Sequence, residues 1–150
     1  MEHTCGIFLI DSKNRILVCH ATHSPWSSWG IPKGLAEPNE TDREASIREL
    51  EEETSLKIGD ILSDVDKNLK YLGTSSYKRG NKVLVAFWAR VSKDIDVQTL
   101  SCKSMVTPEN KTPFPEVDKF QWITLEQAKI YLYQPQKDIL PELISRLKGV

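Results

Sequence analysis

The acidic residues of one short segment have the types and the spacing to bind a divalent cation. Within residues 47–56, IRELEEETSL, four glutamates crowd together: Glu49, Glu51, Glu52 and Glu53. In a helix, at about 100° per residue, Glu52 and Glu53 lie about 60° and 40° to either side of Glu49, so three carboxylates share one face. These like charges repel one another, whereas a hard cation such as Mg²⁺ prefers carboxylate oxygens. Alone, the run is also typical of a solvated helix face.

Local signals predict a helix over residues 42–54 that carries these glutamates. Thr41 is followed three residues later by Glu44, the spacing of a capping box. Pro38-Asn39 favours a turn just before it. Ile47 and Leu50 project away from Glu49 and form an apolar stripe that can pack on a sheet, while Glu44 and Glu51 face solvent.

The rest of the chain predicts strands and helices in alternation. A long loop rich in Ser, Pro, Gly and Trp follows the first two strands and surrounds a short strand near 29–31. The other predicted strands cover 5–10, 16–20, 68–74, 82–91 and 119–123, and two further helices cover 125–133 and 139–148. Interspersed strands and helices indicate an α/β or α+β fold with a mixed sheet.

Composition predicts one globular domain over residues 1–150, with 39% hydrophobic and 27% charged residues. A formal charge of -1 gives the whole chain no attraction for nucleic acid or a membrane surface, so a polyanion must be bound locally. No apolar run approaches the roughly 20 residues that a membrane span requires. Three cysteines, an odd number without metal-ligand spacing, together with the lack of a signal peptide, predict a cytoplasmic protein.

The residues around the glutamates resemble the signature of the Nudix hydrolase family, whose members include MutT-like proteins. Gly34 is followed after five residues by Glu40 and after seven more by Arg48-Glu49-Leu50-x-Glu52-Glu53-x-Ser55-Leu56. Every fixed position of the family pattern is met except one, because Ser55 stands where the family has Gly. The family Gly is expected to close the helix in a left-handed conformation, where another residue costs roughly 1 kcal/mol.

The resemblance implies an α/β/α sandwich that hydrolyses a pyrophosphate linkage in a nucleoside diphosphate joined to another group. Mg²⁺ is the expected cofactor, with Mn²⁺ as a substitute. Glu52 and Glu53 correspond to the main metal ligands, assisted by a backbone carbonyl at Lys33 or Gly34. Glu49 is a further ligand or the base that activates water.

Three more residues have roles that the resemblance implies. Arg48 would orient the carboxylates, and Glu40 would be a supporting carboxylate at the start of the helix. Members of the family often recruit one more carboxylate from a late loop. Glu116 is the candidate for that ligand, and an exposed loop acid is the alternative interpretation.

The residues that would bind the substrate are less sharply indicated. Candidates for phosphate contacts are Lys33, Lys78 and Arg79, although Lys-Arg-Gly-Asn at 78–81 is also typical of a polar hairpin turn. Tyr77 and Trp29, with Trp26 and Trp88, are candidates for stacking a nucleobase, and core packing is the alternative for each.

The Pro-Lys-Gly segment is similar to the branch of the family that cleaves diadenosine polyphosphates. A dinucleoside polyphosphate or a related nucleotide is therefore the leading substrate hypothesis. Nucleoside triphosphates and 5′-phosphorylated RNA ends follow it, and no other nucleic-acid partner is expected. The alternative from another class is a nucleotide-sensing module without catalysis, but the complete set of Arg48, Glu49, Glu52 and Glu53 favours an enzyme. The sequence does not indicate the oligomeric state.

Overall fold

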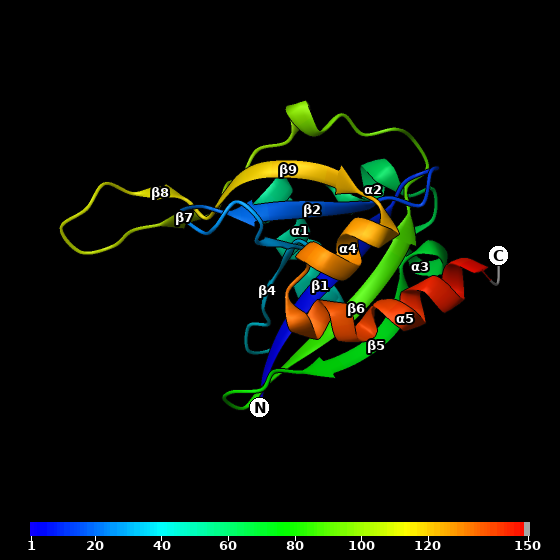
Figure 1. Cartoon of the computed structure of the whole chain (residues 1–150), viewed down its shortest axis with the longest axis horizontal. Helices are drawn as coiled ribbons and strands as arrows, with labels where there is room; N and C mark the ends of the chain where they lie inside the picture. Colours follow the sequence, from blue (N-terminus) through cyan, green and yellow to red (C-terminus); the bar gives the residue numbers. More distant parts are fainter. Residues whose placement is uncertain (149–150) are drawn as a thin grey trace.

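A mixed β-sheet forms the centre of the fold in the computed structural model, which describes residues 1–148 (Figure 1). The strand order along the sheet is β3-β2-β1-β6-β5, with β4 paired to β1 and β9 paired to β2. β1 and β6 run parallel over their whole length, and the other pairs are antiparallel. The strands are β1 (Glu2–Ile10), β2 (Ile16–Ala21), β3 (Trp29–Gly30), β4 (Lys33–Leu35), β5 (Lys70–Ser76), β6 (Lys82–Arg90) and β9 (Val117–Ile123).

Helices cover both faces of the sheet, and two separate apolar cores lie between the layers. Strand β1 supplies both cores by alternation: Ile7 and Leu9 face one core with Leu50 of α1, and Phe8 and Ile10 face the other with Leu143 of α5. The helices are α1 (Asp42–Thr54), α2 (Ile58–Ile61), α3 (Val65–Asn68), α4 (Leu125–Tyr131) and α5 (Gln134–Lys148), with a short 3₁₀ turn at Val97–Thr99. In Figure 1, α4 and α5 lie in front of the sheet and α1 lies behind it. This arrangement confirms the predicted α/β/α sandwich.

The last helix begins earlier than the sequence predicts. The predicted helix over 139–148 begins instead at Gln134 and continues through Pro141. Pro135 is compatible with the first turn of a helix, because the N–H groups there have no partner within the helix. A proline is also typical of a loop, which is why the sequence did not predict the start of this helix. The buried side chains of Ile139, Leu140 and Leu143 stabilise the helix against the sheet in spite of Pro141.

A two-stranded hairpin formed by β7 (Met105–Val106) and β8 (Phe114–Pro115) projects from the body of the molecule (Figure 1). Its base is attached to the loop after β2. The N–H of Thr22 donates to the carbonyl of Glu116 at 3.1 Å, and the Thr22 hydroxyl donates to the Pro115 carbonyl at 2.5 Å. These bonds fix the backbone where the chain enters β9.

None of the helices found within residues 1–148 has both the length and the apolar character needed to cross a bilayer.

Candidate active site

Helix α1 carries the glutamates and begins where its capping signals place it. The Thr41 hydroxyl accepts from the N–H of Glu44 at 3.0 Å, and the Glu44 carboxylate accepts from the N–H of Thr41 at 2.9 Å, which confirms the capping box. The helix packs on the sheet through the fully buried Ala45 and Leu50. This packing turns Glu49 and Glu53 inward, where both side chains are buried.

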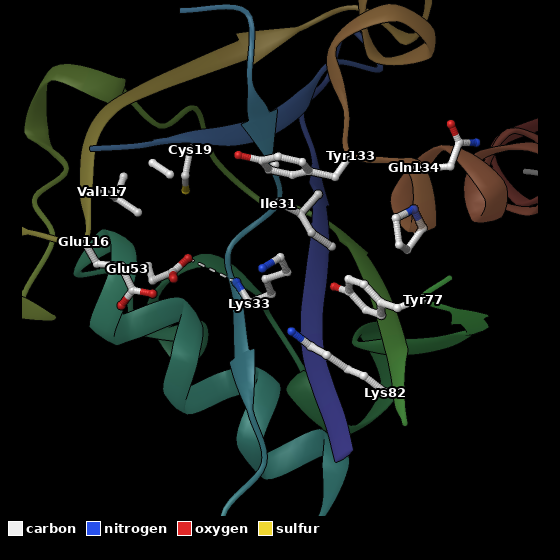
Figure 2. Close-up of a pocket in the computed structure, with 13 residues that line it drawn as sticks. Cys19, Ile31, Lys33, Glu53, Tyr77, Lys82, Glu116, Val117, Tyr133 and Gln134 are labelled. Carbon is white, nitrogen blue, oxygen red and sulfur yellow. Dashed lines mark hydrogen bonds between the residues drawn. The ribbon is translucent and has the colours of Figure 1, made fainter. Parts of the chain in front are cut away.

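Glu53 lies at the bottom of the site and is 5% exposed. Its Oε1 accepts a hydrogen bond from the N–H of Lys33 at 3.1 Å (Figure 2). Burial raises the pKa of Glu53 to about 8, against the lowering effects of the Lys33 N–H and ammonium group. Within residues 1–148, Glu53 forms no ion pair. It is therefore a buried acid that has no ion-pair partner in the described part of the chain.

Glu49 occupies the space beside Gly34. A Cβ at Gly34 would overlap the Glu49 carboxylate, so only a glycine leaves room for this side chain. Burial also raises the pKa of Glu49, to about 7, and the neighbouring charge of Glu52 raises it further while Arg48 lowers it. The close approach of backbone and carboxylate explains the glycine of the signature in physical terms.

Arg48 holds three carboxylates at once. Its Nε and Nη2 donate to the two oxygens of Glu40 at 2.8 and 3.0 Å, and its Nη1 donates to Glu49 at 2.6 Å and to Glu52 at 3.2 Å. The bidentate bonds lower the pKa of Glu40 to about 2. Arg48 thus offsets the repulsion within the cluster, while Glu51 points elsewhere and pairs with Lys103.

The donor set fits a hard divalent cation, although the side chains do not converge as they stand. Within residues 1–148, no group of three or more His, Cys, Asp or Glu side chains is arranged to hold a metal ion. In this arrangement Arg48 donates to Glu49 and Glu52, and Glu53 accepts from the backbone N–H of Lys33. A buried carboxylate without a cation, next to two more carboxylates, presents only oxygen ligands of the kind that Mg²⁺ and Mn²⁺ accept.

A cavity of about 380 Å³ opens beside Glu53 and extends along the sheet (Figure 2). Glu53, Glu116 and Val117 line one end, Tyr77 and Lys82 line the other, and Tyr133 lies along the side between them with its hydroxyl toward Cys19. The Lys82 ammonium lies 4.6 Å from the centre of the Tyr77 ring. Acidic, cationic and aromatic groups therefore share one cavity, which is completed by Cys19, Ala21, Gly30, Ile31, Lys33, Gln134 and Pro135.

The structure brings some of the predicted substrate residues to this cavity and leaves others outside it. Lys33, Tyr77 and Glu116 line the cavity. Lys78 and Arg79 lie in the exposed turn between β5 and β6, away from it. Trp29 packs against the core on the α5 side and lines a separate, smaller pocket with Trp26 and Tyr131.

Two residues that line the cavity, Lys82 and Tyr133, were not predicted from the sequence. Lys82 begins strand β6, three residues after Arg79. The basic residues of this hairpin indicate a phosphate contact, but the prediction placed that contact in the turn, at Lys78 and Arg79, and not at the start of the strand. Tyr133 lies between α4 and α5 and reaches the cavity only through the tertiary fold. No local pattern marks it.

A model of the NUDIX domain matches residues 3–143, almost the whole chain. The chain belongs to the Nudix family. The predicted class, a Nudix pyrophosphohydrolase with a mixed α/β fold, is thereby confirmed, and members of this family generally use divalent metal ions.

Individual relatives of this Nudix chain carry hydrolase names. It is 24% identical to an RNA pyrophosphohydrolase of Pelagibacter ubique, over 97% of this chain and 94% of that protein. It is 26% identical to the asymmetrical bis(5′-nucleosyl)-tetraphosphatase of Sus scrofa, over 76% of this chain and 68% of that protein. The fold also matches a binary complex of a C. elegans Ap4A hydrolase, with a TM-score of 0.73, 20% identity and full coverage of both chains.

Proposed function

We propose that this Nudix chain hydrolyses a pyrophosphate linkage in a nucleotide, and that Mg²⁺, or Mn²⁺ in its place, is the cofactor. The observation that carries the proposal is one continuous cavity with carboxylates at one end, Tyr77 and Lys82 at the other, and Tyr133 along its side (Figure 2). A nucleotide has the same division, because its phosphates need cations and its base needs an aromatic surface.

The phosphate end of the site consists of the residues that would hold the metal. Glu52 and Glu53 would be the main ligands, with the backbone of Lys33 and Gly34 as the facing wall, and Glu49 would be a further ligand or the base that activates water. A divalent cation bound there supplies neutralisation of phosphoryl oxygens and a lower pKa for bound water. Arg48 keeps Glu49 and Glu52 in place through its hydrogen bonds, and its bidentate pair with Glu40 fixes the guanidinium itself.

Two buried acids of the cluster hold protons near neutral pH when no metal is bound. Glu49 and Glu53 have pKa values of about 7 and 8, because burial disfavours their charged forms. A cation binds these carboxylates only in their ionised form, so metal binding releases their protons to solvent. Glu49, beside Gly34, is the carboxylate that would accept a proton from the attacking water once it is ionised.

The nucleoside part of the site consists of Tyr77, beside Lys82 at the end away from the glutamates, and Tyr133, which lies over Ile31 with its hydroxyl toward Cys19 (Figure 2). Aromatic rings stack nucleobases without strong base preference. Lys82 and Lys33 point their ammonium groups into the cavity between the aromatic and acidic ends, where a polyphosphate would run.

A dinucleoside polyphosphate is the substrate that we place first. It joins two nucleosides by a chain of phosphates, and it agrees with the Pro-Lys-Gly segment and with the name of the relative in Sus scrofa. A 5′-triphosphorylated RNA end is the second candidate, favoured by the name of the relative in Pelagibacter ubique, which aligns over nearly the whole chain. Nucleoside triphosphates are the third.

We also propose that residues 1–150 form a single Nudix domain and that it works in the cytoplasm. The domain model covers all but the ends of the chain. The cysteines Cys5, Cys19 and Cys102 are free thiols, which is typical of a reducing compartment.

A substrate panel tests the proposed function. Diadenosine tetraphosphate, ATP and a 5′-triphosphorylated RNA oligonucleotide would each be incubated with the protein and Mg²⁺ or Mn²⁺, and the products separated by ion-exchange chromatography. We expect cleavage of diadenosine tetraphosphate into two mononucleotides, abolished by EDTA. If no nucleotide in the panel is cleaved with either cation while the protein still binds them, the chain is a nucleotide-sensing module and the catalytic proposal is wrong.

A further inference from the structure

Ser104 connects the backbone of Glu52 to Glu116. Its N–H donates to the Glu52 carbonyl at 3.2 Å, its carbonyl accepts from the N–H of Glu116 at 2.9 Å, and its hydroxyl donates to Oε2 of Glu116 at 2.7 Å. One residue in an otherwise irregular stretch therefore bonds to the end of α1 through its backbone and to Glu116 through both backbone and side chain.

The segment 101–104 is held against the C-terminal end of α1. The N–H of Ser101 donates to the carbonyl of Thr54 at 3.3 Å, and the N–H of Lys103 donates to the carbonyl of Glu52 at 2.7 Å. The last carbonyls of a helix have no partner within it, and here a distant segment satisfies two of them. The segment therefore moves with the part of α1 that carries Glu52 and Glu53.

Ser55 adds a bond to this attachment that a glycine could not make. Ser55 ends α1 in a left-handed conformation, with φ 69°. Its hydroxyl donates to the carbonyl of Ser101 at 2.5 Å and lies 2.9 Å from the Ser101 hydroxyl. The one departure from the Nudix signature thus contacts the segment that reaches Glu116.

The Glu116 backbone is fixed on both sides, but its side chain depends on Ser104. Thr22 and Ser104 bond to the carbonyl and the N–H of Glu116. Within residues 1–148, the carboxylate forms no ion pair, and its hydrogen bond comes from Ser104. Glu116 is exposed, and it lies next to Glu53 at the acidic end of the cavity (Figure 2). An exposed carboxylate without that bond would sample several rotamers.

We propose that Ser104 is a positioning residue that holds the Glu116 carboxylate toward Glu53 as an additional ligand of the divalent cation. This inference rests on the proposed function, in that it assumes a cation at the acidic cluster. The hydroxyl occupies one oxygen of Glu116 and leaves the other free. Because Ser104 is bonded to the backbone of Glu52, the same attachment keeps Glu116 in register with the ligands on α1.

Direct titration of Mn²⁺ without substrate tests this role. Free Mn²⁺ would be measured by electron paramagnetic resonance for the full chain and for Ser104→Ala, Ser104→Thr, Glu116→Gln and the double variant Ser104→Ala/Glu116→Gln. Loss of a group that orients a metal ligand typically weakens metal binding about 10- to 100-fold. For an exposed ligand we expect the low end, about tenfold for Ser104→Ala. Ser104→Thr retains the hydroxyl and should restore binding.

The double variant separates positioning from a general structural effect. If Ser104 acts through Glu116, then Ser104→Ala weakens Mn²⁺ binding no further once Glu116 is Gln. Ser92→Ala is the matched control, because it removes a loop hydroxyl that bonds to the Ile61 carbonyl at 2.9 Å, far from this cavity. Circular dichroism melts of every variant show whether the fold is retained.

Three results would overturn the inference: unchanged Mn²⁺ affinity in Ser104→Ala, unchanged affinity in Glu116→Gln, or additive losses in the double variant. Each of these is distinct from failure of the proposed function. A protein that binds Mn²⁺ with the expected coupling but cleaves no nucleotide would keep the positioning role and lose the hydrolase proposal. A protein that binds no Mn²⁺ would contradict both.

Discussion

The carboxylate of Glu53 accepts a hydrogen bond from the backbone N–H of Lys33 at 3.1 Å. This bond joins helix α1 to strand β4, so the Pro-Lys-Gly segment forms the wall that faces the glutamates. Because Lys33 also lines the cavity, the same residue presents its backbone to the acidic end and its ammonium group to the proposed phosphate path. The metal and substrate parts of the proposed site therefore meet at Lys33.

Stability of the metal-free protein should fall as the pH rises from about 5 to 8. Burial holds the pKa of Glu53 at about 8 and that of Glu49 at about 7, above the ordinary 4.5. Between pH 4.5 and these raised pKa values, the folded chain keeps protons on Glu49 and Glu53 that the unfolded chain has lost. Raising the pH through this range therefore favours unfolding. Urea unfolding in EDTA at several pH values measures the slope.

The variant Glu53→Gln is the control for this pH effect. It keeps an oxygen that can accept from Lys33 but does not titrate, so its free energy of unfolding should depend less on pH than that of the parent chain. Mg²⁺ should stabilise the parent more at pH 8 than at pH 6, because metal binding requires the deprotonated ligands. Parallel pH profiles for the two proteins would contradict the assigned pKa.

The substitution Gly34→Ala should lower hydrolysis while changing stability little. The added Cβ would overlap the Glu49 carboxylate, which can move only by leaving its place beside the backbone. Misplacing a reacting group by about 1 Å can cost on the order of 100-fold in rate. The matched control is Gly59→Ala, where a Cβ meets nothing within 4 Å. Steady-state kinetics and melting curves of both variants give the comparison, and equal kcat values would rule out the packing argument.

Replacing Ser55 by Gly and by Ala should have different effects on stability. Both variants lose the hydrogen bonds to Ser101, but only Gly relieves the left-handed conformation, which costs an alanine roughly 1 kcal/mol. We expect Ser55→Ala to be less stable than Ser55→Gly by about 1 kcal/mol, with Ser55→Gly close to the parent. Urea denaturation measures both, and a Gly variant less stable than the Ala variant would be inconsistent with a strained Ser55.

Lys82→Ala should raise the KM for a nucleotide several-fold, and Lys78→Ala should affect it less. The two lysines are four residues apart, but only Lys82 lines the cavity, beside Tyr77. Removing a cation from a phosphate path weakens binding of the substrate ground state and leaves kcat largely unchanged. Kinetics at low ionic strength make the comparison most sensitive. A larger effect of Lys78→Ala would show that the exposed turn contacts the phosphates.

The sequence predicted helix α1 and the inward direction of Glu49 and Glu53 because the determinants are local, whereas Glu52 is only half-buried. The capping box fixes the residue at which α1 begins. From that start, the 100° rotation per residue directs Glu49 and Glu53 inward and Glu51 outward. The left-handed end at Ser55 was expected from the glycine that the family has at this position, and the structure has it. The family resemblance added the pairing with the Pro-Lys-Gly segment, which the Glu53 to Lys33 hydrogen bond now explains.

The aromatic end of the cavity could not be predicted because it depends on long-range packing. Tyr133 reaches Gly30 only through the docking of the segment between α4 and α5 on the sheet. Trp29 alternates with Gly30 along β3, so one side chain faces the core and the other position faces the cavity. A shift of one residue would have exchanged these faces, and the sequence around Trp29 has no period that settles the register.

The rate of nucleotide hydrolysis by Glu53→Gln tests the central claim most directly. The variant would be assayed with Mg²⁺ beside Glu44→Gln, a control on the same helix that retains a capping box. Because Glu53 is a buried acid with no ion-pair partner within residues 1–148, we expect Glu53→Gln to lose at least 100-fold in kcat/KM on the best substrate of the panel, while Glu44→Gln stays near the parent. Undiminished hydrolysis by a folded Glu53→Gln protein would contradict the assignment of this cluster as the catalytic metal site.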